Sequence, residues 1–224
     1  MKTFRADELI EGGEAATAIA AQLALGAIAC VPCNGSYRLV CDALDTDAVM
    51  KLMAVKRREG HAPSLIFVGD ESGLDTIATD VAPTARELAR ALWPGPLTLL
   101  VAPSDAVPSK VQKQLTKANK RLGVRVPADP AMRAVVRAFG GPLLASSANR
   151  EKKPGSHSAA VVRQSFGARL DLFVDGGELS GAISSTVVDV SGDVTTITRL
   201  GALGVERLDA VLAAHGRPAA RLRR

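Results

Sequence analysis

Apolar residues recur along this chain in two patterns, a helical spacing and short continuous runs. Residues 14–25 and 83–92 carry apolar positions three or four apart, and proline stands in the first turn of the second segment. Residues 27–32, 64–68 and 97–102 are short runs rich in Val, Leu and Ile, which are typical of strands buried on both faces. The first half of the chain is therefore predicted to alternate helices with strands.

The same patterns continue in the second half, where strands pair more often. We predict strands at 123–127, 142–146, 172–174, 185–190 and 194–199, with helices from 130 to Gly140, over 158–166 and over 205–215. Residues 33–38 are predicted to be a loop. The fold class predicted is a single-domain α/β fold, a twisted mixed sheet with flanking helices. Residues 1–205 would form the domain, and 206–224 a C-terminal helix with a basic tail.

The segment 41–63 organises these predictions, because a helix there runs into a cationic turn. Asp45 can cap the helix, and an apolar face follows it at spacings of three and four. Lys56 and Arg58 stand just past that face, where two fixed cations suit a polyphosphate or a carboxylate. The alternative is a solvated helix end whose cations complement the helix dipole.

Composition narrows the class of protein. Of 224 residues 47% are hydrophobic, but only one Trp, one Tyr and five Phe are present, so the core must be aliphatic. No apolar run is long enough to cross a bilayer and the N-terminus lacks a signal-peptide core, which predicts a soluble, cytoplasmic protein with no membrane partner. Cys30-x-x-Cys33 is compatible with a redox or zinc pair, but no second pair follows, so buried or loop thiols and no metal site are predicted.

The net charge of +5 is concentrated in two stretches. Six cations and no acid lie between residues 106 and 128, and four arginines lie in the tail beyond 210. Local basicity suits a bound polyanion. The alternatives are that the first stretch is a solvated loop and that the tail is frayed. For the tail we favour this alternative.

Small polar residues follow the predicted strand 142–146. Ser147 and Asn149 stand at its carboxyl end, where open α/β sheets bind ligands, although a local turn that satisfies its own backbone is an equal alternative. No glycine-rich phosphate loop and no G-x-S-x-G motif is present. Covalent catalysis therefore lacks a candidate nucleophile.

Taken together, six short motifs stand in one order along most of the chain. They are K-x-R (Lys56, Arg58), W-P-G-P-L-T (93–98), G-V-R-V-P (123–127), S-A-N (147–149), S-T-V-V-D (185–189) and R-x-G (Arg199, Gly201). This order resembles the YrdC-like family, which includes the threonylcarbamoyl-adenylate synthases.

The resemblance implies a fold around a positively charged cavity and a reaction. An amino acid, by default threonine, and bicarbonate give a carbamate, which ATP adenylylates with loss of pyrophosphate; Mg²⁺ would assist at the phosphates. The product would pass to a tRNA-modifying complex. By resemblance, the catalytic and nucleotide-binding residues are Lys56, Arg58, Ser147 and Asn149, with Arg199 on the phosphates, and the amino acid would be bound by Arg125, Ser185 and Tyr37.

One loop departs from the family pattern. Where the family usually has Pro-Thr-Asp/Glu-Thr-x-Tyr-Gly-Leu, this chain has Pro-Cys-Asn-Gly-Ser-Tyr-Arg-Leu at 32–39. Hydroxyl partners for threonine are lost and Arg38 replaces a glycine, so the choice of acceptor should relax or change.

Two alternative functions follow. The resemblance also implies double-stranded RNA or tRNA as a partner, for which the basic stretch around Lys113, Lys117 and Lys120 would track phosphates. The other alternative is a paralogue that works on a different carbamoyl substrate and has no threonine activity.

Overall fold

A computed structural model of the chain describes residues 1–56, 65–116, 120–149, 157–181 and 183–223. Its strands are β1 (Lys2–Arg5), β2 (Ala29–Cys33), β3 (Ser36–Asp42), β4 (Leu65–Phe67), β5 (Ala78–Thr79), β6 (Leu97–Pro103), β7 (Leu122–Arg125), β8 (Leu143–Ser147), β9 (Leu172–Asp175), β10 (Thr186–Asp189), β11 (Thr196–Arg199) and β12 (Arg221–Leu222). Its α-helices are α1 (Glu14–Leu23), α2 (Thr46–Val55), α3 (Gly73–Ile77), α4 (Pro83–Leu92), α5 (Ser109–Leu115), α6 (Pro130–Phe139), α7 (Ala159–Phe166) and α8 (Val205–Ala214). Two short 3-10 turns, η1 (Ala6–Glu8) and η2 (Gly167–Arg169), complete the described elements.

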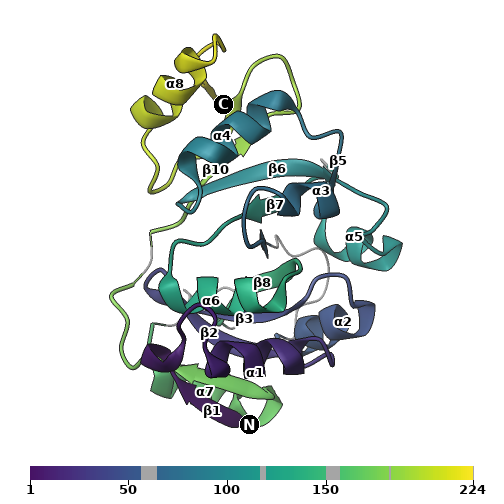
Figure 1. Cartoon of the computed structure of the whole chain (residues 1–224), viewed down its shortest axis with the longest axis vertical. Helices are drawn as coiled ribbons and strands as arrows, with labels where there is room; N and C mark the ends of the chain where they lie inside the picture. Colours follow the sequence, from purple (N-terminus) through teal and green to yellow (C-terminus); the bar gives the residue numbers. More distant parts are fainter. Residues whose placement is uncertain (57–64, 117–119, 150–156, 182, 224) are drawn as a thin grey trace.

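The strands form a mixed sheet that runs the length of the molecule. Its order is β1-β9-β2-β3-β8-β4-β7-β6-β10-β11-β12, with β5 paired to β6. β8 is antiparallel to both of its neighbours, β3 and β4, whereas β4–β7 and β6–β10 are parallel pairs. The termini lie at opposite ends, β1 beside α7 and α1 at one end and α8 at the other (Figure 1). The predicted fold class is confirmed by this arrangement.

Helices bury both faces of the sheet, as the near-continuous apolar strands predict. Along β2, Ala29 and Val31 pack in one cluster with α1 and α6, while Cys30 packs in the other cluster with α2 and α4. Leu208 of α8 belongs to the same cluster as α2 and α4. The C-terminal helix is thus packed on the core that the rest of the chain forms.

Helix boundaries follow their capping residues. The side chain of Asp45 accepts hydrogen bonds from the backbone N–H groups of Asp47 and Ala48, as predicted, and α2 begins there. Asp129 caps α6 in the same way through the N–H of Met132. Gly140 ends α6 with φ of 72°, the left-handed conformation in which glycine has no steric cost.

The loop predicted over 33–38 is wrong, because β3 begins at Ser36 and pairs with β2. Asn34 and Gly35 form the connection with φ angles of 50° and 78°. Two successive positive φ angles match the right-handed twist of a hairpin, and Asn-Gly is the residue pair that adopts them most readily. The Asn-Gly pair therefore indicated a hairpin. The second strand of this hairpin is β3, and Arg38 is one of its residues.

Two basic stretches contain elements that were not predicted. Residues 109–115, in the stretch for which a solvated loop was one alternative, form helix α5. The prediction of a frayed tail is wrong, because Arg221 and Leu222 pair with β11 and Arg217 donates two hydrogen bonds to Glu87, at 3.0 and 2.8 Å. Backbone pairing and a bidentate ion pair supply the contacts that the exposed, basic sequence of the tail did not suggest.

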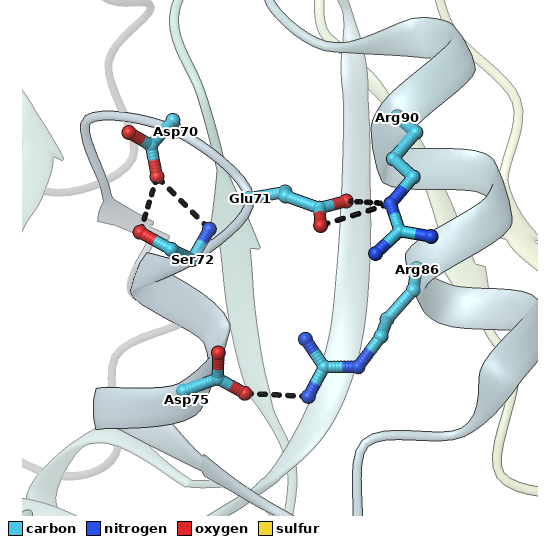
Figure 2. Close-up of polar contacts among 6 residues, drawn as sticks. All are labelled: Asp70, Glu71, Ser72, Asp75, Arg86 and Arg90. Atoms are coloured by element: carbon cyan, nitrogen blue, oxygen red, sulfur yellow. Dashed lines mark hydrogen bonds and ion pairs between the residues drawn. The ribbon is translucent and has the colours of Figure 1, made fainter.

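Ion pairs join α3 and the turn before it to α4 (Figure 2). Nε of Arg90 donates to Oε1 of Glu71 at 2.9 Å, and the guanidinium of Arg86 pairs with Asp75 one turn earlier in α4. These contacts are solvent-exposed, so each stabilises the fold only slightly. Helix α4 leads from these contacts into the turn that begins at Trp93.

Candidate functional site

Lys56 is the buried cation of the site. It follows the last turn of α2, and its side chain reaches the carboxyl end of β8. Nζ donates to Oγ of Ser146 at 2.9 Å, to Oδ1 of Asn149 at 3.2 Å and to the carbonyl oxygen of Ser147. Only 3% of Lys56 is exposed. A buried ammonium needs partners for its three donors, and the end of β8 supplies them.

Ser147 and Asn149 meet at the same point. Oγ of Ser147 donates to Oδ1 of Asn149 at 2.5 Å, and the N–H of Ala148 donates to the carbonyl oxygen of Tyr37 in β3 at 2.9 Å. The local Ser–Asn bond joins two side chains, and it coexists with the bond from Lys56 to Asn149. The structure therefore brings together three of the four predicted catalytic residues; Arg58 lies outside the described residues.

Arg125 ends β7 and holds two turns of the chain. Its Nε donates to the carbonyl oxygen of Gly95 at 2.6 Å, and Nη2 donates to Oδ1 of Asn34 at 3.1 Å. Gly95 belongs to the turn after α4, where the Trp93–Pro94 peptide is cis and a Cβ on Gly95 would lie 2.2 Å from the carbonyl oxygen of Leu92. The W-P-G-P motif thus shapes a turn whose carbonyl oxygen orients Arg125.

Arg199 is the last residue of β11 and contacts Ser185, which directly precedes β10; strands were predicted at both places. The guanidinium of Arg199 donates to the carbonyl oxygen of Ser185, from Nε at 3.2 Å and from Nη2 at 2.9 Å. Oγ of Ser185 is 2.8 Å from Oγ1 of Thr98 on the neighbouring strand β6. Arg199 is therefore oriented by backbone and hydroxyl oxygens rather than by a carboxylate.

Gly201 explains the spacing of the R-x-G motif. A Cβ at this position would lie 2.1 Å from the carbonyl oxygen of Ser184 and 2.5 Å from the carbonyl carbon of Ser185. The N–H of Gly201 donates to Oγ1 of Thr186 at 2.9 Å. Only glycine lets the chain pass this close to the segment that anchors Arg199.

Tyr37 is fully buried in β3. Its hydroxyl donates to the carbonyl oxygen of Gly177 and accepts from the N–H of Gly176, both at 2.9 Å, and its ring stacks on Phe173 with centroids 5.7 Å apart. In this arrangement the hydroxyl holds the segment after β9. A role of Tyr37 in binding an amino acid remains a prediction.

Three arginines form a cluster of positive charge near this site. Burial lowers the pKa of Arg125, and the charges of Arg38 and Arg199 lower it further. Burial and then the charge of Arg38 lower the pKa of Arg199. Among the described residues no carboxylate forms an ion pair with any of the three. We call Arg38, Arg125 and Arg199 the arginine cluster.

Sequence reasoning missed two residues that support the arginine cluster. Asn34 accepts from Arg125, and Asp129 accepts from the N–H of Asn34 at 2.9 Å while it caps α6. The Asn-Gly hairpin signal could have identified Asn34. No local pattern shows that Asp129 reaches a turn 95 residues away.

Other predicted features are distributed as follows. Lys117, one of the three lysines of the predicted RNA-binding stretch, lies outside the described residues, while Lys113 lies in α5 and Lys120 just before β7. Within the described residues, no three His, Cys, Asp or Glu side chains group as a metal site. No helix within them is long and apolar enough to span a membrane.

The family profile for Sua5, YciO and YrdC proteins, which carries the description "Telomere recombination", matches residues 21–201. This chain belongs to the Sua5/YciO/YrdC family. All six motifs that suggested a YrdC-like protein lie within the matched residues or end at the last of them, so the resemblance read from the sequence is confirmed.

Similar proteins with curated names cover most of this family member. A protein of Pyrococcus abyssi named threonylcarbamoyl-AMP synthase is 30% identical over 84% of this chain and 54% of its own length. One of Bacillus subtilis with the same name is 30% identical over 95% of this chain and 62% of its own length. The chain thus spans little more than half the length of these relatives.

A solved structure, P. abyssi Sua5 complexed with L-threonine, superposes with a TM-score of 0.81 at 28% identity and covers 93% of this chain and 58% of that protein. The mixed sheet with its flanking helices is therefore the fold of a Sua5 protein.

Proposed function

We propose that this Sua5/YciO/YrdC protein makes a carbamoyl adenylate from ATP, bicarbonate and an amino acid. The observation that carries the proposal is the buried Lys56 ammonium, which converges with Ser147 and Asn149 at the end of β8. Support also comes from two relatives that are named threonylcarbamoyl-AMP synthase. The enzyme class proposed is a nucleotidyltransferase.

The proposed chemistry needs positioning rather than a protein nucleophile. The amine of the amino acid adds to bicarbonate to give a carbamate and water. A carbamate oxygen then attacks the α-phosphorus of ATP, a P–O bond forms there, and pyrophosphate leaves. Both reactants are anions, so fixed cations lower the barrier by holding them together and by stabilising charge at phosphorus.

Each cation has a proposed place. Lys56, with Ser147 and Asn149, would bind the phosphates near the reacting atom, and Arg58 would join them. Arg199 would bind phosphate oxygens, since it is oriented by Ser185 and has no carboxylate partner among the described residues. Arg125 would bind the α-carboxylate of the amino acid, and Ser185 and Tyr37 would line that end of the site.

Mg²⁺ would enter as part of the substrate, MgATP. The described residues offer no group of three acidic or histidine ligands, so the ion would be held mainly by phosphate oxygens. A partner complex would then transfer the carbamoyl group from the adenylate to adenosine in tRNA, and AMP would leave. The relatives are named for the synthesis of such an adenylate, threonylcarbamoyl-AMP.

The test is pyrophosphate release from ATP, measured with and without bicarbonate and with a panel of amino acids. We expect release to require both, and Lys56→Ala to lower kcat by about 100- to 1,000-fold, the usual effect of removing one charge-stabilising donor. Lys51→Ala is the matched control, because Lys51 lies in the same helix but forms an exposed ion pair with Asp171. Arg58→Ala should resemble Lys56→Ala.

If Lys56→Ala disturbs folding, Asn149→Ala provides a second test. This variant removes one hydrogen-bond partner of Lys56 and leaves helix α2 unchanged. Both variants are compared with the parent protein by thermal melting. Pyrophosphate release that does not depend on bicarbonate, or that survives Lys56→Ala in a folded protein, would contradict the proposal.

A further inference from the structure

Arg38 is a cation that the proposed reaction does not use. It lies in β3, where its cross-strand partner in β8 is Ser147. Directly opposed residues of an antiparallel pair project from the same face of the sheet, so the side chains of Arg38 and Ser147 are neighbours. Arg38 therefore stands beside the residues proposed to bind ATP and the carbamate.

The side chain of Arg38 lacks partners within the described part of the chain. Its Nε is buried and makes no hydrogen bond there, and no carboxylate pairs with its guanidinium. A buried donor without a partner costs free energy. A buried Nε–H group without a partner is accordingly expected where a ligand completes the set of hydrogen bonds.

The charges around Arg38 add up to an excess of positive charge. Arg38, Arg125 and Arg199 form the arginine cluster, and Asp129 is the carboxylate whose charge acts on Arg125. Both oxygens of Asp129 already accept from backbone N–H groups, those of Asn34 and Met132. One acid against three guanidinium groups leaves a net charge of about +2 for a ligand to neutralise.

Arg38 is also linked to the residue proposed to bind the amino acid. It lies on the same hairpin as Asn34, the residue whose amide oxygen accepts from Arg125. In the proposed function Arg125 takes the α-carboxylate, so Arg38 is left for a second anionic group on the same acceptor. A guanidinium recognises a carboxylate through two parallel hydrogen bonds.

We propose that Arg38 determines specificity for an acceptor amino acid with a side-chain carboxylate, that is aspartate or glutamate. This inference rests on the proposed function for its reaction, but the recognition of a dicarboxylate can be tested without turnover. Arg38 would act by binding, so its loss should appear in KM for the acceptor and leave kcat at saturation nearly unchanged.

Steady-state pyrophosphate release is compared for L-aspartate, L-glutamate, L-threonine and carbamoyl phosphate, in the parent protein and in Arg38→Gln and Arg38→Lys. We expect kcat/KM for one acidic amino acid to exceed that for threonine at least tenfold. Arg38→Gln should remove this preference through KM, Arg38→Lys should keep part of it, and KM for ATP should change less than twofold. Arg137→Gln is the control, because Arg137 forms an exposed ion pair with Glu11.

Three results would overturn the inference: threonine or carbamoyl phosphate as the better substrate, equal losses for acidic and neutral amino acids in Arg38→Gln, or a rise in KM for ATP instead. If no amino acid supports turnover, the proposed function fails, and calorimetric titration with L-aspartate and L-glutamate separates the two questions. Binding that Arg38→Gln abolishes supports dicarboxylate recognition, and no binding to the parent protein refutes it.

Discussion

Replacing Gly201 by alanine tests whether Arg199 is held in place by close backbone packing. The new Cβ would lie 2.1 Å from the carbonyl oxygen of Ser184 and 2.5 Å from the carbonyl carbon of Ser185. Both are backbone atoms, so the added methyl group cannot be accommodated by rotating a side chain. The segment that accepts the hydrogen bonds of Arg199 must move.

The magnitude follows from the cost of overpacking. Inserting one methyl group into a tightly packed site costs about 1–3 kcal/mol. For a chain of this size 1 kcal/mol lowers Tm by roughly 2–4 °C, so Gly201→Ala should melt about 2–12 °C lower. If Arg199 binds ATP phosphates, displacement of Ser185 should also raise KM for ATP by about tenfold, which is 1.4 kcal/mol of lost interaction.

Gly192→Ala is the matched control, because no atom lies within 4 Å of a Cβ built there. We expect its Tm and its KM for ATP to equal those of the parent protein. Thermal melting monitored by circular dichroism gives the stability, and pyrophosphate release at varied ATP gives KM. A Gly201→Ala protein with the parent Tm would refute the packing argument, and an unchanged KM would refute the role of Arg199.

Two further predictions concern buried titratable groups. Burial raises the pKa of Tyr37 to about 12, against about 10 in the unfolded chain. The folded state then binds more protons between pH 10 and 12, so its free energy of unfolding should be intact below pH 10 and fall as pH rises through this window. Absorbance at 295 nm reports the ionisation of this sole tyrosine, and a transition near pH 10 in the native protein would contradict it. Burial likewise raises the pKa of Cys33 to about 12. An aromatic disulfide reagent should therefore label this thiol at pH 8 only after the protein unfolds. Rapid labelling of the folded protein would contradict the burial of Cys33.

Much of the fold could be predicted because the decisive signals are local. Helix α4 begins at Pro83 and α6 ends at Gly140, as the proline and glycine rules require. β1 was not predicted, because its short polar sequence becomes a strand only by pairing with β9, about 170 residues away. Tertiary pairing of that kind leaves no mark on the local sequence.

In the candidate site, too, some features could be predicted from the sequence and others could not. The order of the motifs predicted that Lys56 would lie near Ser147 and Asn149, and the structure brings them within hydrogen-bond distance. The carbonyl oxygens that orient the arginines could not be predicted, since a backbone oxygen such as that of Gly95 has no residue-specific signature. Arg38 was noted as a departure from the family pattern, but only its register opposite Ser147 shows where it lies.

The uninterrupted sheet has a consequence for how the reactants would meet. The partners of Lys56 end β8, Arg125 ends β7 and Ser185 precedes β10, and the ladder β8-β4-β7-β6-β10 joins all three. Hydrogen-bonded strands keep a nearly constant spacing, so the sheet is a rigid spacer between the groups proposed to bind nucleotide and acceptor. Alignment of the two reactants would then be fixed when the chain folds, and substitutions in the buried strands β4 and β6 could misalign them without touching either.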